Sequence, residues 1–160
     1  MNGRTIVIGG VVASLVLAMW EMVVEALIPG GAGFFGPPVA IGATVVRDLQ
    51  GSTNPLPVEP LALVLGLAGH MMTSVVLAAI FGAIVARSTL GKGGLVVAGV
   101  IWGGAIFGAM WYAILPVVDP LMLNLDGPAF LLGHGMWGGA LGLLWAAARP
   151  TSEAGSLRSA

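Results

Sequence analysis

Four long apolar runs restrict what this chain can fold into more than any other feature of its sequence. They cover residues 6–28, 61–86, 95–115 and 129–148, and a helix needs about 20 such residues to cross a bilayer. Inside hydrocarbon each backbone N–H and C=O must find a partner within its own segment, so each run is expected to be a helix. Prolines flank the runs, where a missing N–H does least harm: Pro29, Pro60, Pro116 and Pro128. The sequence therefore predicts an all-α integral membrane four-helix bundle, built as a single domain over residues 1–149.

The composition excludes a water-soluble domain. Only 8% of the 160 residues are charged, 58% are hydrophobic and the mean hydropathy is +1.01, whereas soluble domains carry about 25% charged residues. The expected surroundings are a lipid bilayer. The formal net charge of −1 gives no basic surface, so nucleic acid is not an expected partner. Because the chain has no cysteine, a disulfide, a thiolate nucleophile and an iron–sulfur cluster are excluded.

The basic residues predict the orientation, since cytoplasmic loops of membrane proteins are rich in Lys and Arg. Arg47 lies on one side of a four-span arrangement, and the other basic residues lie on the opposite side: Arg4, Arg87, Lys92, Arg149 and Arg158. Both termini are therefore expected in the cytoplasm, with the chain in a plasma membrane of the bacterial inner-membrane type. An uncleaved first helix is expected because Glu21 interrupts the apolar run of a signal peptide. Residues 150–160 are expected to form a disordered cytoplasmic tail.

The first outer loop, residues 29–59, is long for a compact bundle and contains a helix pattern. Pro37 and Pro38 suit the start of a helix and Gly51 suits the position past its end, so a short helix is predicted over residues 37–50. Its apolar residues recur at four-residue spacing, which favours an interfacial or re-entrant helix over the mouth of the bundle. A loop that only shields apolar surface is the alternative.

Two short similarities indicate a tandem duplication of a helical hairpin. Residues 69–72 (Gly-His-Met-Met) resemble residues 133–136 (Gly-His-Gly-Met), and residues 25–29 parallel residues 112–116. Two such repeats would share one orientation and be related by a pseudo-axis along the membrane normal. Coincidence is the alternative, because Gly, Ala and Leu fill all the spans.

The ionisable side chains within the spans are the best functional clue. Such groups are costly in hydrocarbon unless they are paired or hydrated, so a functional site is the first hypothesis for them. At about 1.5 Å per residue, they lie at similar depths below the outer boundary: roughly 5 Å for Glu25, 10 Å for Glu21, 8 Å for His134 and 14 Å for His70. Glu21 and Glu25 share one helix face. Three nearby polar side chains are expected to support the site: Thr73, Ser74 and Tyr112.

Three kinds of chemistry suit carboxylates and imidazoles gathered at one level. A divalent metal ion held by Glu21, His70 and His134 is the first, because facing helices of bundles supply such ligands. Haem b between the two histidines is the second, and a proton or cation relay is the third. A structural role is the alternative: Glu25 would extend to the interface, and each histidine would donate a hydrogen bond to a neighbouring helix.

Glycines at four-residue spacing form further candidate contacts, because small residues let helix backbones approach closely in lipid. They are Gly104, Gly108, Gly135, Gly138, Gly139 and Gly142. These faces predict packing within the bundle, a homo-oligomer, or docking as a subunit of a larger membrane complex.

The leading hypothesis is therefore a small membrane protein whose outer-half Glu/His site binds a metal or haem, or relays protons, in transport or electron transfer. A non-catalytic accessory or scaffold subunit that docks through its glycine faces is the rival. An enzyme is the least favoured class, because the sequence contains no recognisable nucleophile or catalytic motif.

Overall fold

The protein is described by a computed structural model over residues 3–149, and within that range it consists of helices and loops without a strand. Four of its helices are long and apolar enough to cross a membrane by length and composition: Gly3–Leu27, Pro60–Val85, Lys92–Val118 and Gly127–Ala148. These are α1, α3, a third span made of α4 (Lys92–Ala109) and α5 (Leu115–Val118), and α6. The all-helical prediction with four apolar spans is confirmed. The predicted tail, residues 150–160, lies outside the described residues.

Acidic residues define where α3 and α6 begin. The Glu59 side chain accepts a hydrogen bond from the backbone N–H of Ala62, and Asp126 accepts one from Ala129. Each acid is followed by a proline within the first two helical positions. An acceptor before the helix and a proline in its first turn satisfy or remove the N–H groups that a helix start leaves unpaired.

The third span continues through Pro116, so the prediction that this proline lies outside the span is wrong. A π-helical turn over Met110–Ile114 joins α4 to α5, and Pro116 lies near the start of α5. A proline ring clashes with the carbonyl four residues earlier in a regular helix. The wider π turn accommodates that clash, and such turns mark bends in otherwise regular helices.

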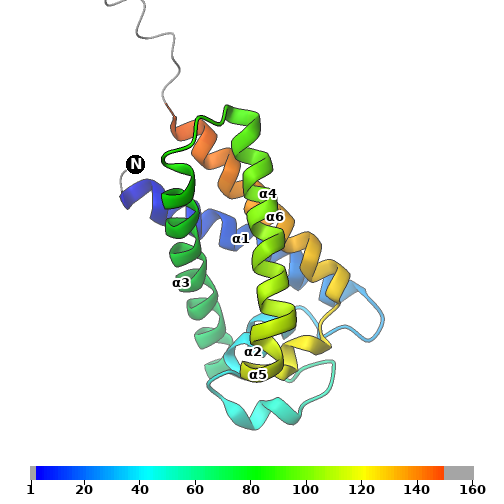
Figure 1. The fold of residues 1–160 in the computed structure, drawn as a ribbon. Helices are drawn as coiled ribbons and strands as arrows, with labels where there is room; N and C mark the ends of the chain where they lie inside the picture. Colours follow the sequence, from blue (N-terminus) through cyan, green and yellow to red (C-terminus); the bar gives the residue numbers. More distant parts are fainter. Residues whose placement is uncertain (1–2, 150–160) are drawn as a thin grey trace, which may run out of the picture.

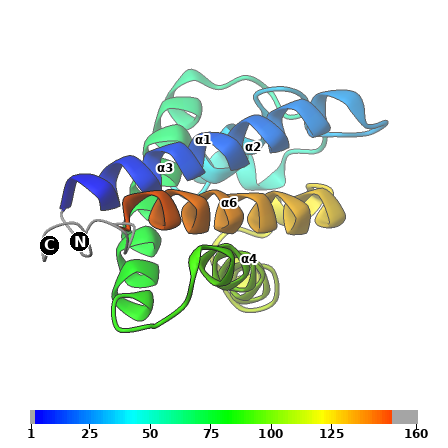
Figure 2. The same ribbon diagram turned by 90° about the horizontal axis from the view of Figure 1, so that it is seen from above.

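The helices α1, α6 and α4 lie side by side in that order, and α3 crosses α1 and α6 at an angle (Figures 1 and 2). α1 packs against both α3 and α6, and α4 packs along α6, whereas α3 and α4 have almost no contact. α1 and α4 begin, and α3 and α6 end, at one end of the bundle, here called the terminal end; the opposite end is called the loop end (Figure 1). The predicted duplication would relate α1 to α4 and α3 to α6 by a pseudo-twofold axis. Under that symmetry α3 would pack on α4 in the way that α1 packs on α6. The structure does not keep this symmetry, and the bundle is open between α3 and α4.

Glycines bring the backbones of α4 and α6 into contact. A Cβ atom on Gly138 would collide with the carbonyl of Gly99, and one on Gly103 would collide with the carbonyl of His134. Gly142 is similarly close to Leu95. Of the other predicted packing glycines, Gly139 has ordinary contact with a valine, whereas Gly104, Gly108 and Gly135 have open space beside them.

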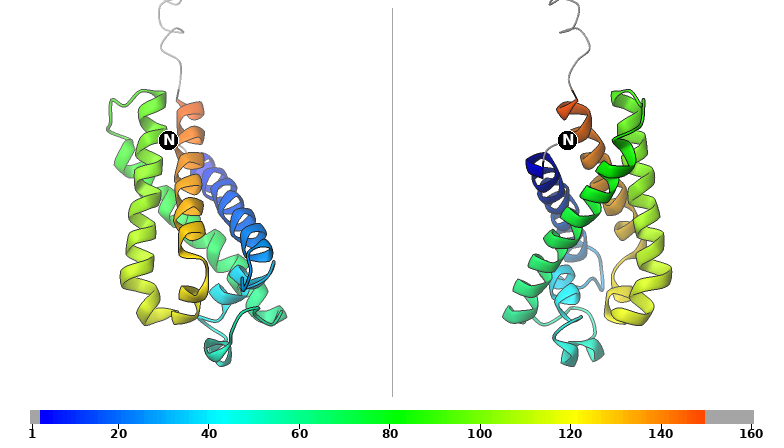
Figure 3. Two further views of the ribbon diagram at one scale, coloured as in Figure 1. Left: turned by 90° about the vertical axis from the view of Figure 1, so that its right-hand side faces the viewer. Right: turned by 60° about the vertical axis from the view of Figure 1, so that its left-hand side comes forward.

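The segment between α1 and α3 lies at the loop end, and it does not contain the single helix predicted over residues 37–50. The structure has a seven-residue helix, α2 (Gly36–Gly42), then turns, then a 3-10 helix over Arg47–Gly51 (Figure 3). Most residues of α2 are buried, and its Gly42 packs on the backbone of Ala62 in α3. Long-range hydrogen bonds made by the residues that follow α2 outweigh the local helix pattern.

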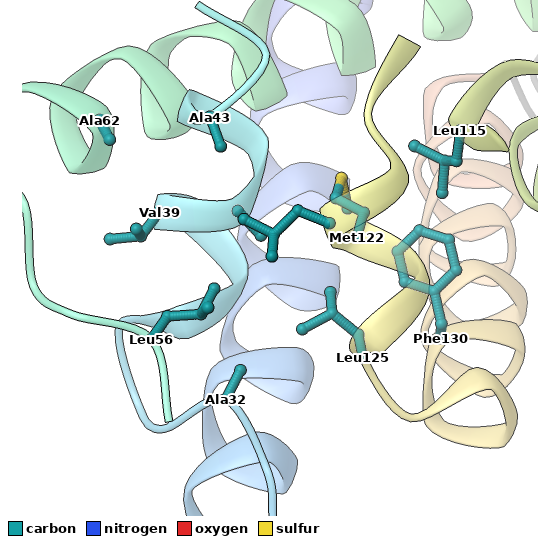
Figure 4. Close-up of a cluster of buried hydrophobic side chains, with 11 residues drawn as sticks. Ala32, Val39, Ala43, Leu56, Ala62, Leu115, Met122, Leu125 and Phe130 are labelled. Atoms are coloured by element: carbon teal, nitrogen blue, oxygen red, sulfur yellow. The ribbon is translucent and has the colours of Figure 1, made fainter. Parts of the chain in front are cut away.

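Two apolar clusters fill the bundle. The first, toward the terminal end, contains Phe81, Leu95, Trp137, Leu141 and Trp145. The second lies at the loop end, where side chains of α2 face those of the segment before α6 and Phe130 (Figure 4). On α3 and α6, the buried polar residues Ser74 and His134 come between members of these two clusters. On α1, Glu21 follows Leu17 of the first cluster. The candidate site therefore lies between the two apolar clusters.

Candidate functional site

A cavity of about 340 Å³ reaches from the loop end toward the middle of the bundle. Residues of α1, α2, α3, the third span and α6 line it, so it occupies the space that the diverging α3 and α4 leave open. Several of its lining residues are exposed and mark its edge: Val45, Thr73, Ile114 and Val118. Three predicted site residues, Glu21, His70 and His134, line the same cavity from three different helices. Thr73, predicted to support the site, lies at its edge.

Glu21 is the least satisfied polar group in the site. Its side chain is only 3% exposed, and neither carboxyl oxygen has a hydrogen-bond partner among residues 3–149. Oε1 lies against Gly133 of α6, where a Cβ atom would be within 2.8 Å of it. The glycine thus lets the carboxyl reach the cavity beside His134. Burying such a group without a partner costs several kcal/mol, roughly, when it is ionised.

His134 is held by its own helix. Its Nδ1 lies 2.8 Å from the Phe130 carbonyl oxygen, and because a carbonyl can only accept, Nδ1 carries the hydrogen. The ring packs between Phe107 and Phe130, with ring centroids 4.4 Å apart for the latter pair. In the neutral ring Nε2 is then a free acceptor.

His70 is held by a neighbouring helix. Its Nε2 lies 3.1 Å from the Ser14 carbonyl oxygen of α1, so Nε2 carries the hydrogen and Nδ1 is the acceptor that remains. The structural alternative, a hydrogen bond to another helix, therefore applies to His70 but not to His134. In both rings one nitrogen is fixed by the backbone and the other is unused by the described residues.

Glu25 does not line the cavity, although it shares a helix face with Glu21. One of its oxygens accepts a hydrogen bond from Ala32 N–H and the other from Asp126 N–H, both at 2.7 Å. It is 1% exposed, so the alternative that it extends to the interface is wrong. Glu25 instead joins two loops at the loop end.

The other predicted supporting residues also have different surroundings. Ser74 donates to the carbonyl of Gly10 and accepts from Trp137 Nε1, so it connects α1, α3 and α6. Tyr112 is 76% exposed and does not line the cavity. The prediction that Tyr112 supports the site considers only how near it lies along the helices, which does not give the direction in which a side chain points around the helix.

Sequence reasoning missed the role of Asp119 in the site. Asp119 lines the cavity at the loop end, is 1% exposed and accepts hydrogen bonds from Thr44 and Gln50. Arg47 donates nearby to the carbonyl of Val118. The one available signal was an acid followed by Pro120 directly after an apolar run, a pattern typical of a turn.

The metal and haem hypotheses need ligands that converge on one point. Among residues 3–149, no three side chains of the His, Asp and Glu types lie close enough together to hold a metal ion. Glu21, His70 and His134 share the cavity wall without forming such a set. A haem between the histidines would have to use Nδ1 of His70, the ring nitrogen nearer the backbone, because Nε2 is bonded to Ser14.

No protein-family model, curated protein or solved structure matches this chain. The geometry of the cavity therefore carries the functional argument.

Proposed function

We propose that this chain is a multi-pass membrane protein whose cavity site exchanges protons as part of transport, with Glu21 as the exchanging group. The observation that carries the proposal is the buried Glu21 carboxyl, which lines the cavity and has no partner among the described residues. Ionisable groups in membrane helices are costly to bury, and those without a structural partner mark proton relays and substrate pathways. His70 and His134 are the accompanying groups, and imidazole titrates near neutral pH in water.

The outward faces of the helices support a location in the bilayer. α3 exposes a row of large apolar side chains: Val64, Met72, Val76, Ile80 and Ile84. A helix with exposed apolar side chains and buried polar ones has the pattern that lipid favours. The positive-inside pattern supports an orientation with the terminal end in the cytoplasm and the cavity in the outer half of the membrane.

Proton exchange fits the site better than metal or haem binding. A relay needs a carboxyl and imidazoles that are accessible from one cavity, and it does not need them to converge on a single point. Electron transfer requires a redox group such as a haem. The ring nitrogens left to ligate it are not equivalent, because His70 would use Nδ1 and His134 would use Nε2.

Infrared difference spectroscopy of the reconstituted protein tests this proposal without a known substrate. A pH step should change the C=O stretching band of a buried carboxylic acid, and Glu21→Gln should remove that band. Tyr112→Phe is the matched control, because this exposed ring lies outside the cavity, and its spectrum should equal the wild type. A band that persists unchanged in Glu21→Gln would contradict the proposal.

A second candidate function, an accessory subunit, has one favourable observation. Gly104 and Gly108 lie one turn apart on α4, and Cβ atoms at both positions would meet nothing within 4 Å. A partner helix or a second copy of the chain could approach this face. Native electrophoresis tests this function, because Gly104→Leu should then abolish a defined oligomer or complex. If it does so, and if the wild type shows no infrared band of a buried carboxylic acid, this second function replaces the first.

A further inference from the structure

When Glu21 is ionised, the three titratable groups at the inner end of the cavity, Glu21, His70 and His134, offer hydrogen-bond acceptors and no free donor. An ionised Glu21 accepts through both oxygens. The N–H groups of neutral His70 and His134 are used by Ser14 and Phe130, so each ring has only a lone pair left. A ligand that complements these groups must bring N–H or O–H donors of its own.

The charges around Glu21 favour a positively charged ligand. No Lys or Arg lines the cavity, and Glu21 makes no ion pair with a described residue. The titratable groups around it on α1, on the other helices and on the loop before α6 are Glu25, His70, His134, Asp119 and Asp126. Three of these groups are acids and the other two are the neutral rings of His70 and His134. The protein therefore supplies no cation to Glu21. An ammonium group would provide both the missing charge and the missing donors.

The walls of the cavity are largely apolar. Leu65 on α3 faces the space shared with Met110, Leu115 and Phe130, which suits an apolar ligand body. The exposed edge includes Val45, 66% exposed, with Ile114 and Val118 of the third span. These three apolar side chains share the edge with Thr44 and Thr73, and the opening lies between helices whose outward faces are apolar, so the mouth faces hydrocarbon in the proposed bilayer location. A ligand would enter sideways, between α3 and α4.

We propose that the cavity binds a lipophilic amine, with its ammonium group at Glu21 and its compact apolar body between α3 and the third span. The volume of about 340 Å³ is at the small end of the range for ligand sites, about 300–1,000 Å³. This inference rests on the proposed function, because the carboxyl that exchanges a proton is the one that holds the amine. When the ammonium binds, the proton that Glu21 carried leaves for water.

Binding of a matched series of probes to the protein in nanodiscs tests the proposal. Adamantan-1-amine carries an ammonium with three N–H donors on a compact apolar body, and adamantan-1-ol is its neutral counterpart. Adamantane-1-carboxylate reverses the charge, and the N,N,N-trimethyl derivative keeps the charge without donors. By calorimetry, the amine should bind at least about tenfold more tightly than the alcohol. The carboxylate should not bind, and the trimethyl derivative should bind less tightly than the amine.

Substitutions at Glu21 assign the head-group site. Glu21→Gln should reduce amine affinity to that of the alcohol, and Glu21→Asp should keep the preference for the amine. If Glu21→Gln does not fold, the probe series on the wild type still decides. Equal affinity for amine and alcohol would overturn the proposal in favour of a neutral, hydroxyl-bearing ligand. Equal amine binding by the wild type and a folded Glu21→Gln protein would also overturn it.

The absence of native cysteines allows a direct test of the entry route. Thr73→Cys and Ile114→Cys place thiols on opposite edges of the mouth, and a bifunctional thiol reagent joins them in the double variant. Crosslinking should slow amine binding, whereas the same reagent on either single variant should not. Unchanged binding kinetics in the crosslinked protein would overturn sideways entry.

Failure of this inference can be distinguished from failure of the proposed function. If the infrared band of Glu21 responds to pH but the amine binds no better than the alcohol, the ligand class is wrong and proton exchange stands. If the wild type shows no such band, the proposed function fails whatever the amine does.

Discussion

Replacing Glu21 and Glu25 separately by methionine should change stability in opposite directions, although the residues lie one turn apart on α1. Both are almost fully buried, 3% and 1% exposed. Glu21→Met removes a buried group that has no partner, which relieves about 1–3 kcal/mol. Glu25→Met removes the acceptor of two backbone N–H groups, at Ala32 and Asp126. Leaving both without a partner costs about 2–6 kcal/mol.

Thermal unfolding in one detergent, followed by near-ultraviolet circular dichroism of the tryptophans, measures the two effects. For a chain of this length, 1 kcal/mol shifts Tm by about 2–4 °C. Glu21→Met should therefore raise Tm by a few degrees, roughly, and Glu25→Met should lower it by about 10 °C. A loss of stability in Glu21→Met comparable to that in Glu25→Met would refute the reasoning, because Glu21 would then have a structural partner.

Further substitutions test the packing around the cavity. Gly138→Ala should destabilise the bundle by about 2 kcal/mol, because its Cβ would meet the α4 backbone and overpacking costs about 1–3 kcal/mol. Gly104→Ala, with open space beside it, should be neutral or slightly stabilising; equal effects would contradict the α4–α6 contact. Ser74→Ala should cost about 1–3 kcal/mol and change the fluorescence of Trp137, which donates to its hydroxyl; an unchanged spectrum would count against that bond. Asp119→Ala should increase proteolysis of the loop after α2, because its two side-chain donors there lose their acceptor; unchanged proteolysis would contradict this role.

The sequence predicts the helices well because a bilayer leaves the backbone few alternatives. The four runs and the acid-then-proline starts of α3 and α6 are local signals, and the structure has helices at those places. The third span shows where local reasoning stops. Pro116 is a helix-flanking signal in sequence, but a π turn accommodates it inside the helix.

The candidate site was predicted in part, since residue counts give the depth of a side chain and not its partners. Glu21, His70 and His134 do line one cavity. Glu25 has the same helical phase as Glu21, yet it lies beside two loops whose paths the sequence does not specify. Tyr112 is 76% exposed and does not line the cavity. The gap between α3 and α4 depends on helix-to-helix packing, which no local pattern encodes.

Nitrogen-15 NMR of the histidine rings tests most directly whether Glu21, His70 and His134 share one cavity. The structure predicts a neutral His134 protonated at Nδ1 and a neutral His70 protonated at Nε2, because each of these nitrogens faces a backbone carbonyl oxygen. Glu21→Gln should shift the resonances of both unprotonated nitrogens. Tautomers opposite to these, or ring signals that ignore the change at Glu21, would contradict the account.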